Sequence, residues 1–248
     1  MNQVNFTANR MINFLNKKYQ RFFESRKIYE LRHLIHRNFK EKDLGSLNLD
    51  FSDKPQREDI VQKIIDKKQY KNYLEIGCFK DELFSKIICE NKIGVDPVNG
   101  GTIRTTSDNF FEKNNNKFDC IFIDGLHKYH QVRKDIINSL EVINENGIIL
   151  LHDCLPNDVF AQAVPRCQHV WNGDVWKALV EFRTHENLDV YTCYADHGIG
   201  VIFKRKNKNL LKINTTNFHK LKFEEYFNNY KSLMNVISFE ELMRVLGN

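Results

Sequence analysis

The chain has 248 residues, of which 42% are hydrophobic and 28% are charged, and its formal net charge is +5. This composition is typical of a folded globular protein and excludes an intrinsically disordered or collagen-like chain. No stretch approaches the roughly 18 continuous apolar residues of a membrane span, and polar residues interrupt the N-terminal segment where a signal peptide would need an apolar core. We therefore expect a cytoplasmic protein.

The cysteines are spread along the chain and form no C-x-x-C pair. They are Cys78, Cys89, Cys120, Cys154, Cys167 and Cys193. This spacing does not indicate a structural zinc site. Cys89 and Cys120 lie in apolar sequence contexts, where a free thiol packs as a small hydrophobic group. We expect all six cysteines to be reduced.

Positive charge is concentrated at the N-terminus. Residues 1–42 contain ten Lys and Arg against three Glu, a net charge of +7. Apolar residues recur there at helical spacing, which predicts one or two amphipathic helices. The charge belongs either to a solvated helix face or to a surface that binds phosphates or a membrane. We delimit a basic helical extension at residues 1–50.

The first predicted strand, 71–77, follows a predicted helix at 59–68 and contains Glu75 and Gly77 at its end. Apolar residues then recur at helical spacing, which predicts a second helix: Leu83, Phe84, Ile87 and Ile88. Strand, glycine turn and helix form the opening unit of a doubly wound α/β domain, whose ligands bind beyond the carboxyl ends of the strands. Glycine suits this position because the backbone must turn sharply and lie close to a ligand.

A second short strand ends at Asp96, nineteen residues after Gly77. In nucleoside-binding α/β folds, an acid about 20 residues past the glycine turn accepts hydrogen bonds from ribose hydroxyls. The alternative is a solvent-exposed aspartate at a strand end. Residues 102–105 predict a third strand. Ser107 and Asp108 either cap the helix that follows or lie near the base of a bound nucleoside.

The clearest strand is 118–124, an apolar run that suits a central parallel strand covered on both faces. It ends at Asp124, and His127 follows three residues later. A predicted helix leads from there to a fifth strand, which ends at His152 and Asp153. Because the carboxyl ends of parallel strands share one edge of the sheet, these four polar residues are expected to meet there.

The last third of the chain predicts a loop, a helix and a hairpin. Residues 155–173 lack clear periodicity, which is typical of a lid or binding loop. Asp174 is a suitable N-cap for the helix that follows. Two strands, 188–194 and 200–204, are separated by a short turn and predict an antiparallel hairpin. Residues 238–241, with the sequence Ser-Phe-Glu-Glu, predict a capping box for a final helix.

Five parallel βα units followed by a β-hairpin form the architecture of the class I S-adenosylmethionine-dependent methyltransferases, and residues 72–204 resemble them throughout. Leu74-Glu75-Ile76-Gly77 resembles their first motif, and Asp96 resembles the acid that holds the cofactor ribose. The segment 107–111 resembles the one beside the adenine.

This resemblance implies a fold and a division into domains. We expect a doubly wound, Rossmann-like, seven-stranded sheet with five parallel strands, a C-terminal antiparallel hairpin, and added N- and C-terminal helices. The methyltransferase domain would span residues 51–206, and a C-terminal helical extension would span 207–248.

Two strings, Ile123-Asp124-Gly125-Leu126-His127-Lys128-Tyr129 and Leu151-His152-Asp153, are similar to a bacterial subgroup of these enzymes that is encoded with sugar-modifying and polysaccharide-assembly enzymes. The similarity implies S-adenosylmethionine as the methyl donor. The acceptor would be a hydroxyl of a sugar or nucleotide-linked sugar in bacterial glycan or capsule biosynthesis.

The resemblance also implies roles for individual residues. The implied cofactor-binding residues are Glu75, Gly77, Cys78, Asp96, Ser107, Asp108 and Asp124. The catalytic candidates are His152, Asp153 and His127. His152 is the first candidate general base, because histidine titrates near neutral pH. Asp153 would orient it or bind the substrate, and His127 is the alternative base.

The chain departs from the usual first motif at residues 78–80, where the family carries further glycines. Some related O-methyltransferases bind magnesium through acids at the ends of strands four and five, and Asp124 and Asp153 match those positions. We do not favour magnesium, because the neighbouring His152 and Cys154 are not hard oxygen ligands.

Other functions stay open at this point: methylation of another small molecule, methylation of nucleic acid through the basic arm, NAD(P)-dependent redox chemistry, or a non-catalytic partner protein. The sequence lacks the Asn-Pro-Pro-Tyr and Pro-Cys motifs of nucleic-acid methylation and the G-x-G-x-x-G of dinucleotide binding. Steeply salt-dependent binding of RNA or DNA would support the nucleic-acid alternative. The helical ends are natural dimerisation surfaces, so a homo-oligomer also stays open.

Overall fold

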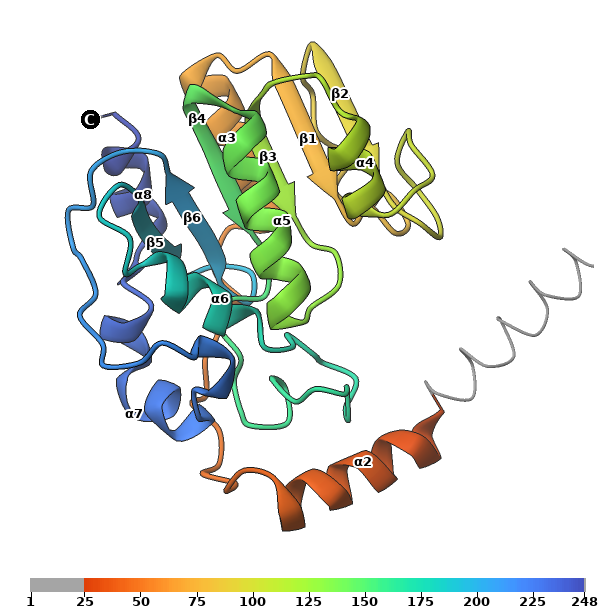
Figure 1. Ribbon diagram of the computed structural model, residues 1–248, viewed down its shortest axis with the longest axis vertical. Helices are drawn as coiled ribbons and strands as arrows, with labels where there is room; N and C mark the ends of the chain where they lie inside the picture. Colours follow the sequence, from red (N-terminus) through yellow and green to blue (C-terminus); the bar gives the residue numbers. More distant parts are fainter. Residues whose placement is uncertain (1–24, 248) are drawn as a thin grey trace, which may run out of the picture.

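A seven-stranded sheet forms the centre of the computed structural model, which describes residues 25–247 (Figure 1). The strands are β1 (Asn72–Ile76), β2 (Asn91–Val95), β3 (Phe118–Ile123), β4 (Ile143–Leu151), β5 (Asp189–Cys193), β6 (Ile199–Phe203) and β7 (Val236–Ile237). Their order across the sheet is β2-β1-β3-β4-β6-β5-β7, and only β6 runs antiparallel to its neighbours. This topology confirms the expected doubly wound, Rossmann-like fold with its β5–β6 hairpin.

Helices lie on both faces of the sheet, and the first of them lies beyond the carboxyl ends of the strands (Figure 1). They are α2 (Arg26–Phe39), α3 (Arg57–Lys68), α4 (Ser107–Lys113), α5 (Tyr129–Val142), α6 (Val175–Phe182), the 3-10 helix η1 (Phe218–Lys220), α7 (Phe223–Leu233) and α8 (Phe239–Val245). Helices α4 to α7 contribute to the hydrophobic core on one face, whereas α3, α8 and the segment after β1 contribute to the other. Successive side chains of β1, β3 and β4 therefore enter two separate cores, one on each face of the sheet.

Local sequence explains several element boundaries. The inner face of α3 is made of residues one and four apart along the helix, all fully buried: Ile60, Val61, Ile64 and Ile65. The predicted capping box is present at α8, where Ser238 Oγ accepts from the backbone N–H of Glu241 at 3.2 Å. Asp174 precedes α6 as expected, but its carboxylate accepts from the backbone N–H of Tyr129 at 2.6 Å and so caps α5 instead.

Two predicted elements differ from the structure. Residues 102–105 form only a single bridge, between Ile103 and Val95, so the seventh strand is supplied instead by β7 from the C-terminal segment. The chain after β1 forms turns rather than a regular helix, and Ile88 is 78% exposed. Phe79 and Asp81 both have positive φ angles, 47° and 61°, which prevent a right-handed helix from starting there.

Helix α2 packs on the irregular segment 155–173 rather than on the sheet. The ring of His33 stacks on Phe160 at 3.8 Å, and Arg32 Nη1 donates to the carbonyl of Arg166 at 3.0 Å. Leu15, Tyr19 and Phe22, which contributed to the helical pattern expected at the N-terminus, lie outside the described residues. Between residues 25 and 247, no helix combines the length and apolar composition needed to cross a membrane.

Candidate active site

The carboxyl ends of β1, β3 and β4 bring most of the predicted polar residues to one edge of the sheet. Ile76 pairs with Ile123, and Ile123 pairs with Leu151, so the residues after these strands are neighbours in space. Asp124 and His152 follow directly after β3 and β4. The hydrogen bond from the backbone N–H of Asp124 to the carbonyl of Ile76, at 2.8 Å, continues the strand pairing into the site.

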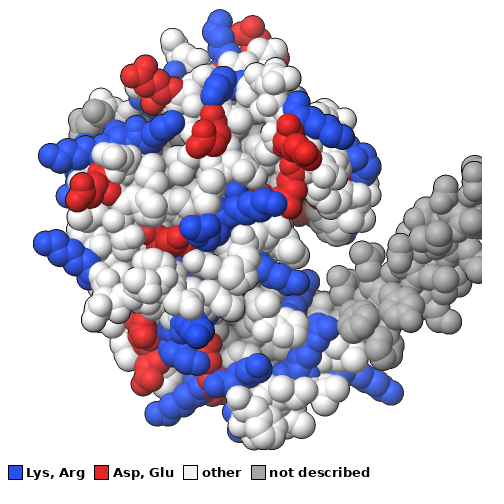
Figure 2. Space-filling model, in the orientation of Figure 1, with Lys and Arg blue, Asp and Glu red and all other residues white. Residues whose placement is uncertain are grey.

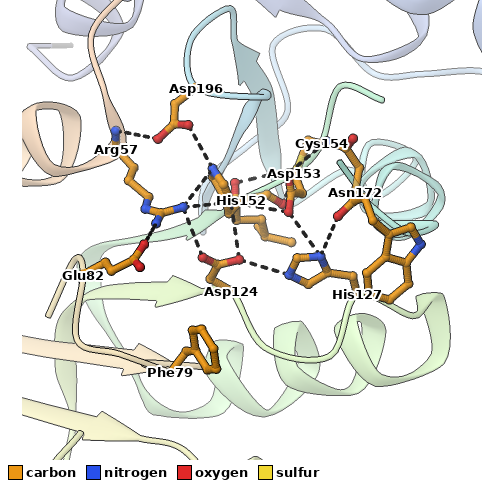
Figure 3. Close-up of polar contacts among 12 residues, drawn as sticks. Arg57, Phe79, Glu82, Asp124, His127, His152, Asp153, Cys154, Asn172 and Asp196 are labelled. Atoms are coloured by element: carbon orange, nitrogen blue, oxygen red, sulfur yellow. Dashed lines mark hydrogen bonds and ion pairs between the residues drawn. The ribbon is translucent and has the colours of Figure 1, made fainter. Parts of the chain in front are cut away.

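His152 lies at the centre of a ring of carboxylates (Figure 3). Its Nδ1 is 3.3 Å from Asp124 Oδ1 and 3.5 Å from Asp153 Oδ2, and its Nε2 is 3.3 Å from Asp196 Oδ1. Burial alone would lower the pKa of His152, but the Asp153 and Asp124 carboxylates raise it well above its ordinary value. The surroundings of His152 therefore favour its protonated form, and both of its ring nitrogens face carboxylates.

His127 bridges two of the same carboxylates from the other side. Its Nε2 is 3.1 Å from Asp124 Oδ1, and its Nδ1 is 3.1 Å from Asp153 Oδ2. The ring stacks on Trp171 with centroids 5.3 Å apart, and 18% of the side chain is exposed, against 5% for His152. Burial lowers the pKa of His127, but its hydrogen bond to Asp124 raises it above the ordinary value.

Asp124 is the acid shared by both histidines. Burial opposes its ionisation, but His152 and His127 hold its pKa far below the ordinary value. Asp153, the second bridging acid, adopts a left-handed backbone conformation with φ 61° and accepts from Asn172 Nδ2 at 2.9 Å. Strained backbone of this kind clusters at functional sites.

Arg57, at the first position of α3, completes the charge balance of the site. Its Nη1 is 3.5 Å from each ring nitrogen of His152 and 3.6 Å from Asp124 Oδ2, and its Nη2 is 3.5 Å from Glu82 (Figure 3). Its backbone N–H donates to Asp196 Oδ2 at 2.8 Å, so Asp196 caps the positive end of α3. The carboxylates of Asp124, Asp153 and Asp196 thus face the guanidinium of Arg57 and the imidazole rings of both histidines.

The sequence analysis did not identify Arg57, Asn172 or Asp196. Arg57 lies in a distant element with no local motif, whereas Asn172 and Asp196 lie in the strings 171–177 and 196–201, which also resemble the bacterial subgroup but assign neither residue a role. The pairing of β6 with β4, in which Gly200 lies opposite Leu151, is the one signal that places the hairpin turn at Asp196 beside the end of β4. Asp196 can be placed beside β4 only when the pairing of β4 with β6 is known, and the sequence pattern did not predict that pairing register.

The turn after β1 lies directly against the acid cluster. Gly77 has φ 93°, and a Cβ there would lie 2.2 Å from the carbonyl oxygen of Asp124, so only glycine fits. The left-handed residues Phe79 and Asp81 follow in the same turn. At 78–80, where the family pattern has further glycines, the chain therefore keeps a glycine-like backbone without the glycines. The Phe79 side chain in this turn is 57% exposed.

Asp96, directly after β2, holds this turn in place through hydrogen bonds to its carboxylate. Its Oδ2 accepts from the backbone N–H of Phe79 at 2.9 Å, and its Oδ1 accepts from those of Val98 and Asn99 at 2.7 and 2.9 Å. These bonds leave one lone pair, on Oδ2, of a carboxylate that is held at the edge of the turn. A sharp glycine turn with a fixed acid beside it fits a nucleoside-bearing cofactor.

Glu75 and Cys78 are buried beneath the turn. The Tyr73 hydroxyl donates to Glu75 Oε2 at 2.7 Å, and the carboxyl is 2% exposed. Burial, partly opposed by the hydrogen bond from Tyr73 and assisted by the charge of Asp124, raises the pKa of Glu75 to about 7. The Cys78 thiol is buried near the backbone of Gly94 and Gly101, and burial raises its pKa.

Ser107 and Asp108 lie away from the acid cluster, on α4. Gln131 Nε2 of α5 donates to Ser107 Oγ at 3.2 Å and to Asp108 Oδ1 at 3.1 Å. Asp108 Oδ2 is also 2.7 Å from Lys134 Nζ, and this hydrogen bond lowers the pKa of Asp108. Both residues tie α4 to α5, and the helix cap that was expected of them is supplied by Thr106.

Asp124, His152 and Asp153 could also hold a divalent cation, because one potential ligand atom of each lies within 4.8 Å of the others. Two carboxylates and an imidazole suit a transition metal better than Mg²⁺, which prefers oxygen ligands. Ligands must be deprotonated to bind a metal. The donor set therefore fits a metal only after His152 has lost its proton.

Comparisons with known proteins indicate one class of domain. Residues 95–154, which contain Asp124, His127, His152 and Asp153, match the family model of a methyltransferase domain. A search of curated protein sequences found no match.

Several solved structures resemble this chain at low similarity. A putative O-methyltransferase from Klebsiella pneumoniae shows 12% identity and a TM-score of 0.48, covering 60% of this chain and 80% of its own. The SAH-bound Podospora anserina methyltransferase PaMTH1 shows 16% identity and a TM-score of 0.47, covering 74% and 97%. The Bacillus cereus O-methyltransferase in complex with SAH shows 11% identity and a TM-score of 0.45, covering 73% and 100%. TM-scores below 0.5 do not identify an activity for this chain.

Proposed function

We propose that this protein is an S-adenosylmethionine-dependent O-methyltransferase, with its catalytic domain at residues 51–206. The observation that carries the proposal is the position of the acid and histidine cluster. Asp124, His127 and Asp153 lie beyond the strand ends, directly against the Gly77 turn, inside the stretch that matches a methyltransferase domain. Ligands of open α/β sheets bind at this edge.

The cofactor side of the proposal rests on Gly77, Asp96 and Glu75. The backbone of the Gly77 turn can approach the cofactor closely, and Asp96 accepts from its ribose hydroxyls. Glu75 supports the turn from below, where its carboxyl titrates near neutral pH. The exposed ring of Phe79 offers an apolar surface at the same turn. Ser107 and Asp108 act through the position of α4, on the adenine side.

The reaction requires an acceptor hydroxyl to lose its proton as its oxygen attacks the methyl carbon. Bound S-adenosylmethionine supplies that methyl group on a sulfonium, which leaves as a neutral thioether. We assign the general base to His127, because its side chain is the more exposed of the two histidines and is held between Asp124 and Asp153. A neutral His127 takes the hydroxyl proton, and the two carboxylates stabilise the resulting imidazolium.

His152 was the first candidate base on sequence grounds, and its surroundings favour a different role. Carboxylates contact both ring nitrogens of each histidine, but 5% of the His152 side chain is exposed, against 18% for His127, so His152 leaves less room for an acceptor hydroxyl. We propose that His152 is a positioning residue, which lowers the pKa of Asp124 and holds Asp124 and Asp153 against His127.

The proposed acceptor is a hydroxyl of a sugar or nucleotide-linked sugar in glycan biosynthesis. Its support is the similarity of residues 123–129 and 151–153 to the bacterial subgroup described above. Transfer of labelled methyl groups to a panel of sugars, nucleotide sugars and phenols would test this class. Turnover on a phenol alone would retain the methyltransferase and overturn the sugar acceptor.

Titration calorimetry with S-adenosylhomocysteine tests the cofactor site directly. Gly77→Ala forces a Cβ into the Asp124 carbonyl, so we expect binding to weaken by at least about tenfold. Gly125→Ala is the matched control, because the nearest atom to its new Cβ is 3.6 Å away. Absence of binding to the parent protein, or equal binding to Gly77→Ala and the parent, would overturn the proposal.

A further inference from the structure

Helix α2 exposes an apolar stripe that nothing in the described part of the chain covers. Its members are Leu31, Leu34, Ile35 and Phe39, which are 52%, 57%, 42% and 80% exposed. Leu31, Ile35 and Phe39 are four residues apart and so lie along one side of the helix. The opposite side is the one that packs on segment 155–173, through Tyr29 and His36.

The same helix is strongly basic. Residues 26–39 carry four Lys and Arg against one Glu, a net charge of +3. Glu30 pairs with Arg26 at 2.9 Å, whereas Lys27 and Arg37 are exposed and form no ion pair among residues 25–247. Figure 2 shows Lys and Arg side chains gathered along the edge of the molecule where α2 lies, with uncharged surface between them.

We propose that α2 docks on the surface of an anionic lipid bilayer. A helix with an exposed apolar side and flanking cations lies in the plane of a membrane interface, with its apolar side in the acyl boundary and its cations at anionic headgroups. A second copy of the chain is the less complementary occupant, because two paired α2 helices would each bring a charge of +3 to the same contact. The positive charge of α2 therefore favours an anionic lipid surface over a second copy of the chain.

The position of α2 gives this docking a consequence for catalysis. In Figure 1, α2 lies beyond the carboxyl ends of the strands, on the edge that also carries His127 and Asp153. Docking through α2 would therefore place the candidate active site over the membrane surface, within reach of an acceptor attached to a lipid. This consequence rests on the proposed methyl transfer, whereas the docking itself does not.

Co-sedimentation with vesicles tests the docking without cofactor or acceptor, so its outcome is independent of the methyl-transfer proposal. The probes are phosphatidylcholine vesicles with and without about 30 mol% phosphatidylglycerol. We expect the full chain to bind the anionic vesicles at low salt, to release them as salt is added, and to bind neutral vesicles at least about tenfold more weakly.

Two sets of variants separate the apolar and the charge contributions. Leu31→Ser with Ile35→Ser should weaken vesicle binding by at least about tenfold, because it removes the centre of the stripe. Ile88→Ser with Val98→Ser is the matched control, since both side chains are more than half exposed elsewhere on the molecule. This control should bind as the parent does.

The charge variant is Lys27→Gln with Arg37→Gln, and it keeps the proposal testable if the stripe variant fails to fold. It should bind anionic vesicles several-fold more weakly and with a shallower dependence on salt. Lys206→Gln with Lys208→Gln is its control, at exposed lysines of another segment.

Light scattering after size exclusion follows each variant in parallel. Failure of the parent to bind anionic vesicles, or unchanged binding by both α2 variants, would overturn the proposal. If the chain does not bind vesicles but forms a dimer that depends on Leu31 and Ile35, the stripe would instead be a contact with a second copy of the chain.

Discussion

Glu75→Gln tests the physical state of the buried acid beneath the cofactor turn. The carboxyl of Glu75 is 2% exposed, and the Tyr73 hydroxyl at 2.7 Å is its hydrogen-bond donor. Burial raises its pKa from 4.5 to about 7, which corresponds to about 3 kcal/mol at 1.36 kcal/mol per pH unit. A folded-state pKa above the unfolded value stabilises the fold fully below the unfolded pKa, and this stabilisation is lost as the pH rises towards 7.

The glutamine variant cannot ionise but keeps the size of the side chain and an acceptor for Tyr73. Its stability should therefore lack the decrease between about pH 4.5 and pH 7, and above pH 7 it should exceed that of the parent by about 3 kcal/mol. For a chain of this length, that difference corresponds to a rise of roughly 6–12 °C in Tm. If the carboxylate contributes to holding the cofactor, the same variant should bind S-adenosylhomocysteine at least about tenfold more weakly.

Urea unfolding at about pH 5 and about pH 8, with binding measured at pH 8, checks both statements. Glu145→Gln is the control, because it removes the same charge from an exposed position at the start of β4. An identical pH dependence of the unfolding free energy for Glu75→Gln and the parent would refute the inferred burial penalty. Greater stability without weaker binding would refute only the cofactor role.

Three further predictions concern the acid cluster. His152→Ala leaves three carboxylates around an empty site, so we expect the unfolding free energy near pH 6 to fall by roughly 3–5 kcal/mol, and the loss to shrink below about pH 4 as the carboxylates protonate; an equal loss at both pH values in urea titrations would contradict this. Because the pKa of His127 is raised, the rise of kcat/KM with pH should have its midpoint above pH 6.5. His127→Gln should abolish this rise while retaining cofactor affinity. An unchanged pH profile in the variant would exclude His127 as the base. Chelation by EDTA should leave turnover within about twofold, because His127 and His152 already balance the charge of Asp124 and Asp153; a tenfold loss restored by Mn²⁺ would show that a metal replaces the His152 proton.

Most elements were predicted from their hydrophobic pattern, and the helix after β1, the strand at 102–105 and the edge strand β7 were not. Predicting β3 and the inner face of α3 required no tertiary information, since the sequence itself shows the continuous apolar run of β3 and the helical spacing of apolar residues in α3. The segment after β1 also has helical spacing, but the left-handed Phe79 and Asp81 replace its first helical turn. The short strand at 102–105 has one pairing partner only, and the edge strand β7 is two residues long. Such short pairings form only where the tertiary structure places a partner strand alongside them.

The sequence by itself determined where the chemistry would gather. Apolar runs that stop at Asp96, Asp124 and His152 mark strand ends, and parallel strands place their carboxyl ends at one edge of the sheet. Only the tertiary structure determined which groups those residues contact and how their pKa values shift. Arg57 and Asp196 reach His152 from distant elements, and the Asp153 and Asp124 carboxylates raise the pKa of that histidine well above its ordinary value against the opposing effect of burial. Protonation depends on all charges within a few ångströms, whatever their separation along the chain.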